Sequence, residues 1–290
     1  MDNIFDKACL IQLSARLWQG LKMIDPSVMA QLGNSDWVKG RKHLVDPEHL
    51  APIKACVSRA RCLLKKQALP FPLDGLTLVP KDAISGIELG LQDVQREFWQ
   101  SVLGFVDYYP RIREEAQQGL GELFDETDYP MSVRDRFNFE WRYVQLALPG
   151  RSRLLSPEIY ERERRKFVDL MEATRAEATL ALRAEFSGLV GHLAERLSVN
   201  GSDRPKVLRS SMVEKLSDFL DSFGNRNLFQ DEQLADLVNL ARGMIHGVDG
   251  DALRNNESLR QRVGLQMQTV KDAIDAAIEN LPRRRVLMAA

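Results

Sequence analysis

The sequence predicts a mainly α-helical, elongated protein with a long central helix and a small sheet of two or three strands near the N-terminus. The long helix is predicted because residues 156–197 contain no proline after Pro157, so that at about 1.5 Å per residue they would span roughly 60 Å. The small sheet is predicted because short segments with strand-like patterns, separated by prolines and glycines, lie in residues 9–80.

The composition is that of an ordinary globular protein. The chain has 290 residues, 44% of them hydrophobic and 28% charged, and its net charge of −1 means that any basic site must be a local patch. An odd number of cysteines, three in a chain of this length, argues against a disulfide scaffold. The chain has no secretory signal and no apolar run of about 18 residues, so we expect a cytoplasmic protein that does not cross a membrane.

The first 80 residues predict one helix among short strands. Residues 9–18 alternate only partly in polarity and fit either a strand or a helix. Residues 41–45 and 77–79 fit short strands, and prolines exclude a helix from residues 69–80. Residues 47–67 predict a helix because Leu50, Ile53, Val57, Ala60 and Leu64 form one apolar stripe.

The next segment predicts three helices. Residues 82–107 carry apolar side chains at helical spacing, and we expect Tyr108-Tyr109-Pro110 to break or bend this helix. A second helix is predicted for residues 110–124, and a third from Ser132, as the cap, to Trp141.

The long helix has a favourable start, with Ser156 as N-cap and Pro157 in the first helical position. Its length is typical of a coiled-coil arm or of the spine of an elongated body. Its apolar stripe does not follow a strict heptad, and it packs either within the chain or against a partner. For the second interpretation, the candidate partner-binding residues are Phe167, Leu170, Met171, Leu182, Leu189 and Leu193.

Three further helices are predicted after a linker-like stretch at residues 199–205, namely residues 205–223, 230–245 and 257–281. The chain is therefore expected to have three consecutive parts: a mixed, mainly helical domain at 1–150, the long helix at 151–199 and a helical region at 200–290.

A basic patch at the start of the long helix is the candidate nucleic-acid site, and it consists of Arg151, Arg153, Arg162, Arg164, Arg165 and Lys166. Trp141 or Tyr160 would be available for stacking on bases. Glutamates are interleaved, however, and the spacing predicts ion pairs from Glu158 to Arg162 and from Glu161 to Arg165. A solvated, self-paired helix face is the alternative.

Motifs for catalysis or metal binding are absent from the sequence. It contains neither a G-x-S-x-G elbow nor a Walker loop, and His43, His49, Cys56 and Cys62 lack the close pairs of a zinc site. The carboxylates of Asp125, Glu126 and Asp128 fall in one turn, which favours a role in forming that turn. We therefore predict no catalytic residue, metal ligand or cofactor.

Several strings resemble the family known as domain of unknown function 3150. They are LSARLWQGLK (13–22), LGNSDWVKGRKHLVDPEHLAPI (32–53), the Val79-Pro80 exit from the proline-rich loop, and LFDETDYPMSVRDRFNF (123–139). The resemblance implies a protein of a phage or an integrative mobile element, often encoded beside a MoxR-like AAA+ ATPase and a von Willebrand A protein. It carries over no catalytic residue.

These features together favour a non-enzymatic helical adaptor or scaffold in the cytoplasm of a bacterial host. The resemblance implies that it would bind a MoxR-type AAA+ ATPase or that enzyme's von Willebrand A partner. Two alternatives remain open: an accessory protein that binds nucleic acid during recombination or replication, and a structural protein that self-assembles.

Overall fold

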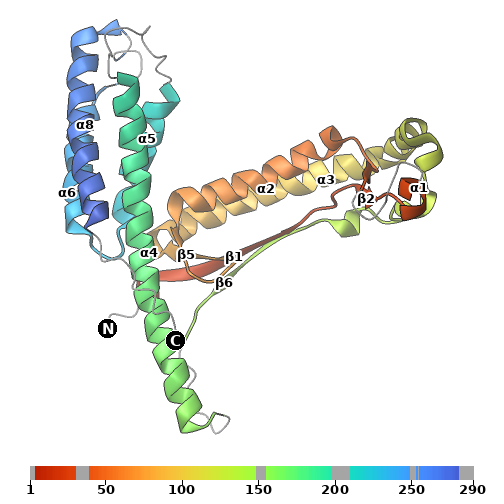
Figure 1. The fold of residues 1–290 in the computed structure, drawn as a ribbon, viewed down its shortest axis with the longest axis horizontal. Helices are drawn as coiled ribbons and strands as arrows, with labels where there is room; N and C mark the ends of the chain where they lie inside the picture. The colour runs from red at the N-terminus through yellow and green to blue at the C-terminus, as the bar shows by residue number, and fades with distance from the viewer. Residues whose placement is uncertain are drawn as a thin grey trace. The chain divides into compact units, whose positions relative to one another are not determined.

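The structure is a computed structural model that describes residues 4–30, 39–147, 155–197, 210–248, 253 and 255–280 (Figure 1). The chain forms two compact units. Unit 1 comprises Met1–Leu10, Lys66–Ala83 and Gln145–Ala290, and unit 2 comprises Ile11–Lys65 and Ile84–Val144. Because the chain passes from one unit to the other several times, the units differ from the three consecutive parts predicted from the sequence.

Four helices form the body of unit 1: α4 (Pro157–Leu197), α5 (Ser210–Arg226), α6 (Glu232–Ile245) and α8 (Glu257–Glu279). Helix α8 runs antiparallel to α4, since Arg183 Nη1 donates to the Ala277 carbonyl and Arg260 Nη2 to the Arg196 carbonyl. Phe186 of α4 stacks on Phe219 of α5, with ring centroids 5.5 Å apart. The bundle therefore has an apolar core that α4 shares with its neighbours.

The strands of the described residues form one sheet and one separate ribbon. A four-stranded sheet has the order β4–β5–β1–β6, in which β4 (Leu69–Pro70) pairs antiparallel with β5 (Leu76–Pro80) so that Leu69 faces Leu78. Strand β1 is Ala8–Arg16 and β6 is Asn138–Val144. A separate ribbon pairs β2 (Leu21–Met23) antiparallel with β3 (Arg41–His43), and Lys22 faces Lys42.

Two long helices dominate unit 2, where α2 (Pro47–Gln67) lies alongside α3 (Ile84–Leu120) (Figure 1). Asp46 starts α2, because its carboxylate accepts the backbone N–H of Glu48 at 2.9 Å while Pro47 takes the first helical position. Further elements of the described residues are α1 (Pro26–Ala30) and 3-10 helices at Ile4–Asp6, Lys81–Ala83, Gly121–Leu123, Glu126–Asp128 and Arg134–Arg136.

The predicted fold class is confirmed: the protein is mainly α-helical with a small antiparallel sheet. The long helix is confirmed as α4, and the backbone N–H of Ile159 donates to Ser156 Oγ at 3.3 Å, as expected of an N-cap. Residues 9–18, which were ambiguous, form most of strand β1.

Of the predicted break or bend at Tyr108-Tyr109-Pro110, the break is wrong, because α3 continues through Pro110 to Leu120. A proline inside a helix costs about 3 kcal/mol. Packing offsets this cost here, since Tyr109 and Ile112 on either side are buried and the Trp18 ring lies 5.9 Å from the ring of Tyr109.

The predicted helix from Ser132 to Trp141 is also wrong. This segment contains a single 3-10 turn and then strand β6. The aromatic residues Phe137 and Phe139 alternate with polar ones, and their rings pack on Phe105 and Phe98 of α3 at 5.8 and 5.2 Å. A period of two is the pattern of a strand, and it places both aromatic rings on one face.

Candidate partner-binding site

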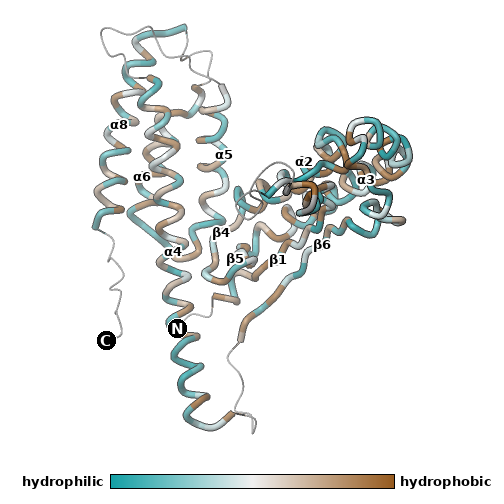
Figure 2. The backbone as a smooth tube through the Cα atoms, turned by 45° about the vertical axis from the view of Figure 1, so that its right-hand side comes forward, coloured by the Kyte–Doolittle hydropathy of each residue, from teal (hydrophilic) through white to brown (hydrophobic). Residues whose placement is uncertain are grey.

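Helix α4 divides into two parts that differ in packing. No side chain is buried in residues 157–172, which we call the arm, whereas ten are buried from Ala173 to Leu197. Figure 2 shows mostly hydrophilic positions along the arm, with hydrophobic ones between them. The arm therefore receives little core packing, although its helix is continuous with the part that packs in the bundle.

Four large apolar residues remain accessible on the arm. Ile159 is 37% exposed, and Phe167, Leu170 and Met171 are half-buried. The other predicted partner-binding residues lie in the bundle part of α4: Leu189 is half-buried, and Leu182 and Leu193 are only 2% and 1% exposed. The last two side chains pack in the core of the chain itself, so the accessible part of the predicted surface is the arm.

The basic residues of the arm pair with its own glutamates. Arg164 Nη1 lies 3.4 Å from Glu161, Lys166 Nζ 2.9 Å from Glu163, and Arg162 Nε 3.4 Å from Glu163. The hydrogen bond from Lys166 lowers the pKa of Glu163. None of these is one of the predicted Glu158–Arg162 and Glu161–Arg165 pairs. Two of them join i,i+3 neighbours, which also face each other on a helix, and the third joins the adjacent residues Arg162 and Glu163.

Two members of the predicted basic patch, Arg151 and Arg153, lie outside the residues that the structure describes. Arg165 is exposed. The arm also carries Glu158, Asp169 and Glu172, so its described basic side chains stand among at least as many carboxylates. The local charge is therefore close to neutral.

A groove opens beside α4 where the helix enters the bundle. It has a volume of about 850 Å³, and its walls come from residues 172–183 of α4, from the segment 229–232 that leads into α6, and from Ile278 of α8. All of these residues belong to unit 1. A concave surface of this size is within the range of binding sites.

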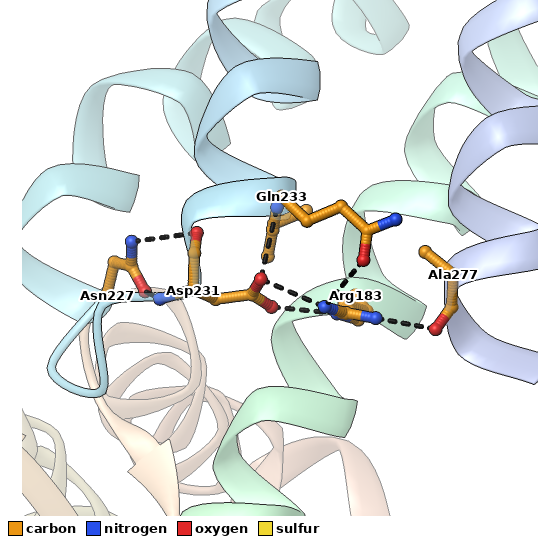
Figure 3. Close-up of polar contacts among 6 residues, drawn as sticks. Arg183, Asn227, Asp231, Gln233 and Ala277 are labelled. Atoms are coloured by element: carbon orange, nitrogen blue, oxygen red, sulfur yellow. Dashed lines mark hydrogen bonds and ion pairs between the residues drawn. The ribbon is translucent and has the colours of Figure 1, made fainter. Parts of the chain in front are cut away.

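A buried ion pair between Arg183 and Asp231 contributes to the lining of the groove. Figure 3 shows the contacts of this pair. Arg183 Nε lies 2.7 Å from Asp231 Oδ2, and Arg183 Nη2 lies 2.9 Å from Asp231 Oδ1. The same guanidinium donates to the Ala277 carbonyl at 2.5 Å and to Gln233 Oε1 at 3.3 Å. One arginine therefore joins α4, the start of α6 and the end of α8.

Asp231 also serves as the N-cap of α6, since its carboxylate accepts the backbone N–H of Leu234 at 3.1 Å. Asn227 holds the preceding loop by accepting the Asp231 backbone N–H at 2.8 Å. Burial opposes ionisation of this carboxyl, but the bonds from Arg183 and Leu234 prevail and lower the pKa of Asp231. The aspartate is therefore ionised at neutral pH and complements the guanidinium.

Sequence reasoning missed the groove and the ion pair. Arg183 and Asp231 lie 48 positions apart, and only the tertiary structure brings them together. One available signal was the position of Arg183 between buried positions of the long helix, next to Leu182 and three residues before Phe186. A charged residue at a core position usually requires a buried partner.

The carboxylates of residues 125–128 are occupied by contacts within the chain. Asp128 pairs with Lys42 at 2.6 Å and with Lys22 at 3.3 Å, and Glu126 pairs with Arg113. Asp125 Oδ1 accepts the hydroxyl and backbone N–H of Thr127, which lowers the pKa of Asp125. These contacts are those of a structural cluster.

No group of three or more histidine, cysteine, aspartate or glutamate side chains in the described ranges is arranged to hold a metal ion. In the same ranges, no helix is long and apolar enough to cross a membrane. The three cysteines are free thiols, and burial raises the pKa of Cys9.

The comparisons with known proteins agree with the resemblance seen in the sequence. No curated protein and no solved structure shows a significant match to the chain. The model of one family, described as a protein of unknown function (DUF3150), matches residues 5–196 and so covers unit 2 entirely and unit 1 as far as the end of α4. The chain therefore belongs to the DUF3150 family.

Proposed function

We propose that this protein is a non-enzymatic helical adaptor that binds a protein partner through the arm of α4. The observation that carries the proposal is that the arm displays Ile159, Phe167, Leu170 and Met171 while none of its residues is buried. Full burial of such a side chain from full exposure contributes about 1.5–3 kcal/mol, and each of these partly buried side chains would gain a part of that against a partner. On this proposal the arm is an amphipathic helix, and a partner would cover the apolar side chains that are now partly accessible.

The rigid attachment of the arm supports this role. A helix of this length is marginal on its own in water. Here it is the continuation of the bundle part of α4, which Arg183 ties to α6 and α8. The partner would therefore bind a helix that is already formed, and ordering it would cost little conformational entropy.

The first partners to test are a MoxR-type AAA+ ATPase and its von Willebrand A protein, which the family resemblance implies. On this proposal the chain works in the bacterial cytoplasm for a phage or an integrative mobile element. Binding of the purified full chain to each candidate is measured by calorimetry at micromolar concentrations, with and without ATP. We expect binding that Leu170→Asp together with Met171→Asp abolishes.

A matched variant controls for general effects of exposed aspartates. Leu89 and Leu103 lie on α3 in unit 2 and are 64% and 50% exposed, so Leu89→Asp with Leu103→Asp adds the same charges away from the arm. This control variant is expected to bind as the unmodified chain does. Equal loss in both variants, with helix content unchanged by circular dichroism, would remove the arm from the interface.

Nucleic-acid binding stays the second candidate, with Arg162, Arg164, Arg165 and Lys166 as its described residues. The accessibility of these side chains favours it, but their pairing with Glu161 and Glu163 leaves little excess positive charge. Phosphate binding gains its free energy from uncompensated cations. The arm is therefore better suited to a protein surface of mixed polarity.

A further inference from the structure

The groove beside α4 gathers carboxylates that have no partner. Apart from the Arg183–Asp231 pair, its charged lining consists of Glu172, Glu177, Glu232 and Arg175. None of these four side chains forms a hydrogen bond or ion pair with another residue in the part of the chain that the structure describes. The groove therefore carries an excess of negative charge.

The groove also presents apolar surface between these charges. Leu180 is 46% exposed there, and Phe229 and Ile278 are half-buried. Ala173 and Ala176 are too small to block a close approach to the backbone of α4. An occupant would thus bury apolar side chains against the floor while its charges faced the glutamates.

The dimensions fit a short helix. The stretch of α4 from Glu172 to Arg183 rises about 16 Å, which is roughly three helical turns. An amphipathic helix laid in an apolar groove of this length is a common mode of peptide recognition. The buried Arg183–Asp231 pair fixes the wall that such a helix would contact.

We propose that this groove binds a short amphipathic helix of a protein partner, with apolar residues on one face and lysines or arginines at its edges. The cationic edges follow from the unpaired carboxylates of Glu172, Glu177 and Glu232, which would repel the phosphates of a nucleic acid. The groove is separate from the apolar residues of the arm, so this second contact goes beyond the proposed function and can be tested independently.

Fluorescence anisotropy with the full-length chain tests the proposal. The probe is a fluorescein-labelled helical peptide about three turns long, with leucines at helical spacing and lysines flanking them. A matched peptide carries glutamates in place of the lysines. We expect the cationic peptide to bind about tenfold more tightly or better. Equal binding of both peptides, or preference for the anionic one, would overturn the proposal.

Charge-reversal variants locate the binding. Glu172→Lys, Glu177→Lys and Glu232→Lys together are expected to weaken binding of the cationic peptide about tenfold. The control reverses Glu114, Glu122 and Glu214, which are exposed and lie outside the groove, so both variants have the same net charge. If the two variants bind the peptide equally, its site is not this groove and the proposal is wrong.

Apolar contact is tested separately with Leu180→Ala, which should weaken binding several-fold. Leu265→Ala is its control, because Leu265 is 74% exposed on α8 and does not line the groove. Binding should also survive Leu170→Asp with Met171→Asp, so failure of the arm and failure of the groove remain distinguishable. A dimer in light scattering that only the groove variants dissociate would instead assign the groove to a second copy of the chain and overturn the proposal.

Discussion

The guanidinium of Arg183 donates two hydrogen bonds to the carboxylate of Asp231, at 2.7 and 2.9 Å, although the two residues are 48 positions apart in the sequence. Both side chains are 8% exposed. The pair lines the groove and lies about three helical turns from the point where α4 changes from the arm to a packed helix, well inside the packed part. It therefore anchors the helix on which both proposed contacts depend.

Removing one charge of this pair should destabilise unit 1. Asp231→Asn keeps an N-cap for α6 but leaves Arg183 buried without a counter-charge, and we expect a loss of about 3–5 kcal/mol in the free energy of unfolding. The double variant Arg183→Met/Asp231→Asn should recover part of this lost free energy, because it leaves no unpaired buried charge. Urea unfolding followed by far-ultraviolet circular dichroism measures both variants.

Tryptophan fluorescence supplies an internal control for this experiment. The four tryptophans all fall within the sequence ranges of unit 2. In Asp231→Asn, the urea midpoint measured by tryptophan fluorescence should therefore shift less than the midpoint measured by circular dichroism. A single transition that shifts equally by both probes would show that the effect is not confined to unit 1.

Acid should weaken unit 1 through its carboxylates. The pKa of Asp231 and that of Asp275 are both lowered from the usual 3.8, the latter chiefly by the hydrogen bond from Lys271. Each carboxylate therefore contributes stability above that value, and the contribution is lost as pH falls through the lowered folded pKa. Asp231→Asn should show a smaller loss of stability than the unmodified chain as pH falls from about 5 to about 2, because this window spans the usual value and the lowered folded pKa. An equal loss would rule out Asp231 as a source of the acid sensitivity.

Substitution of Gly20 by alanine should be more destabilising than substitution of Gly121. Both have positive φ, of 60° and 52°, so alanine costs about 1–2 kcal/mol at either position. At Gly20 an added Cβ would lie 2.2 Å from Val45 Cγ1, whereas at Gly121 nothing lies within 4 Å. Gly20→Ala should therefore destabilise unit 2 clearly more than Gly121→Ala, as measured by tryptophan fluorescence in urea. Equal losses would mean that the backbone conformation alone sets the cost.

Charge reversal in the arm should have little effect on nucleic-acid binding. Arg162→Glu, Arg164→Glu and Arg165→Glu replace side chains that stand among glutamates, so few phosphate contacts are at stake. We expect the affinity for a single-stranded oligonucleotide to change by no more than about twofold. A large drop in affinity, together with a reduced salt dependence, would favour the nucleic-acid alternative.

The helices could be predicted from sequence where apolar periodicity and end signals agree, as in α2 and α4. Prediction failed where tertiary contacts prevailed over local signals. Pro110 is tolerated because its neighbours Tyr109 and Ile112 are buried, and β6 forms because its alternating aromatic residues pack on α3. Local sequence does not encode such contacts.

The candidate site was predictable only in part. The length of α4 and its apolar residues indicated an interaction surface, but the spacing alone could not distinguish the buried Leu182 and Leu193 from the accessible Leu170 and Met171. The groove depends on three segments that are distant in sequence, residues 172–183, 229–232 and 278. Its unpaired glutamates look like any exposed helix charge until these segments are brought together.

Affinity purification of the tagged full-length chain from cells carrying its native locus tests the adaptor function most directly. The unmodified chain, the Leu170→Asp/Met171→Asp variant and the Leu89→Asp/Leu103→Asp control are each purified with and without nuclease, and bound proteins are identified by mass spectrometry. We expect a protein partner, such as an AAA+ ATPase, to co-purify with the unmodified chain even after nuclease treatment. The same partner should co-purify with the control variant and be absent with the Leu170→Asp/Met171→Asp variant. Recovery of nucleic acid alone, or of partners that disappear on nuclease treatment, would contradict the adaptor function.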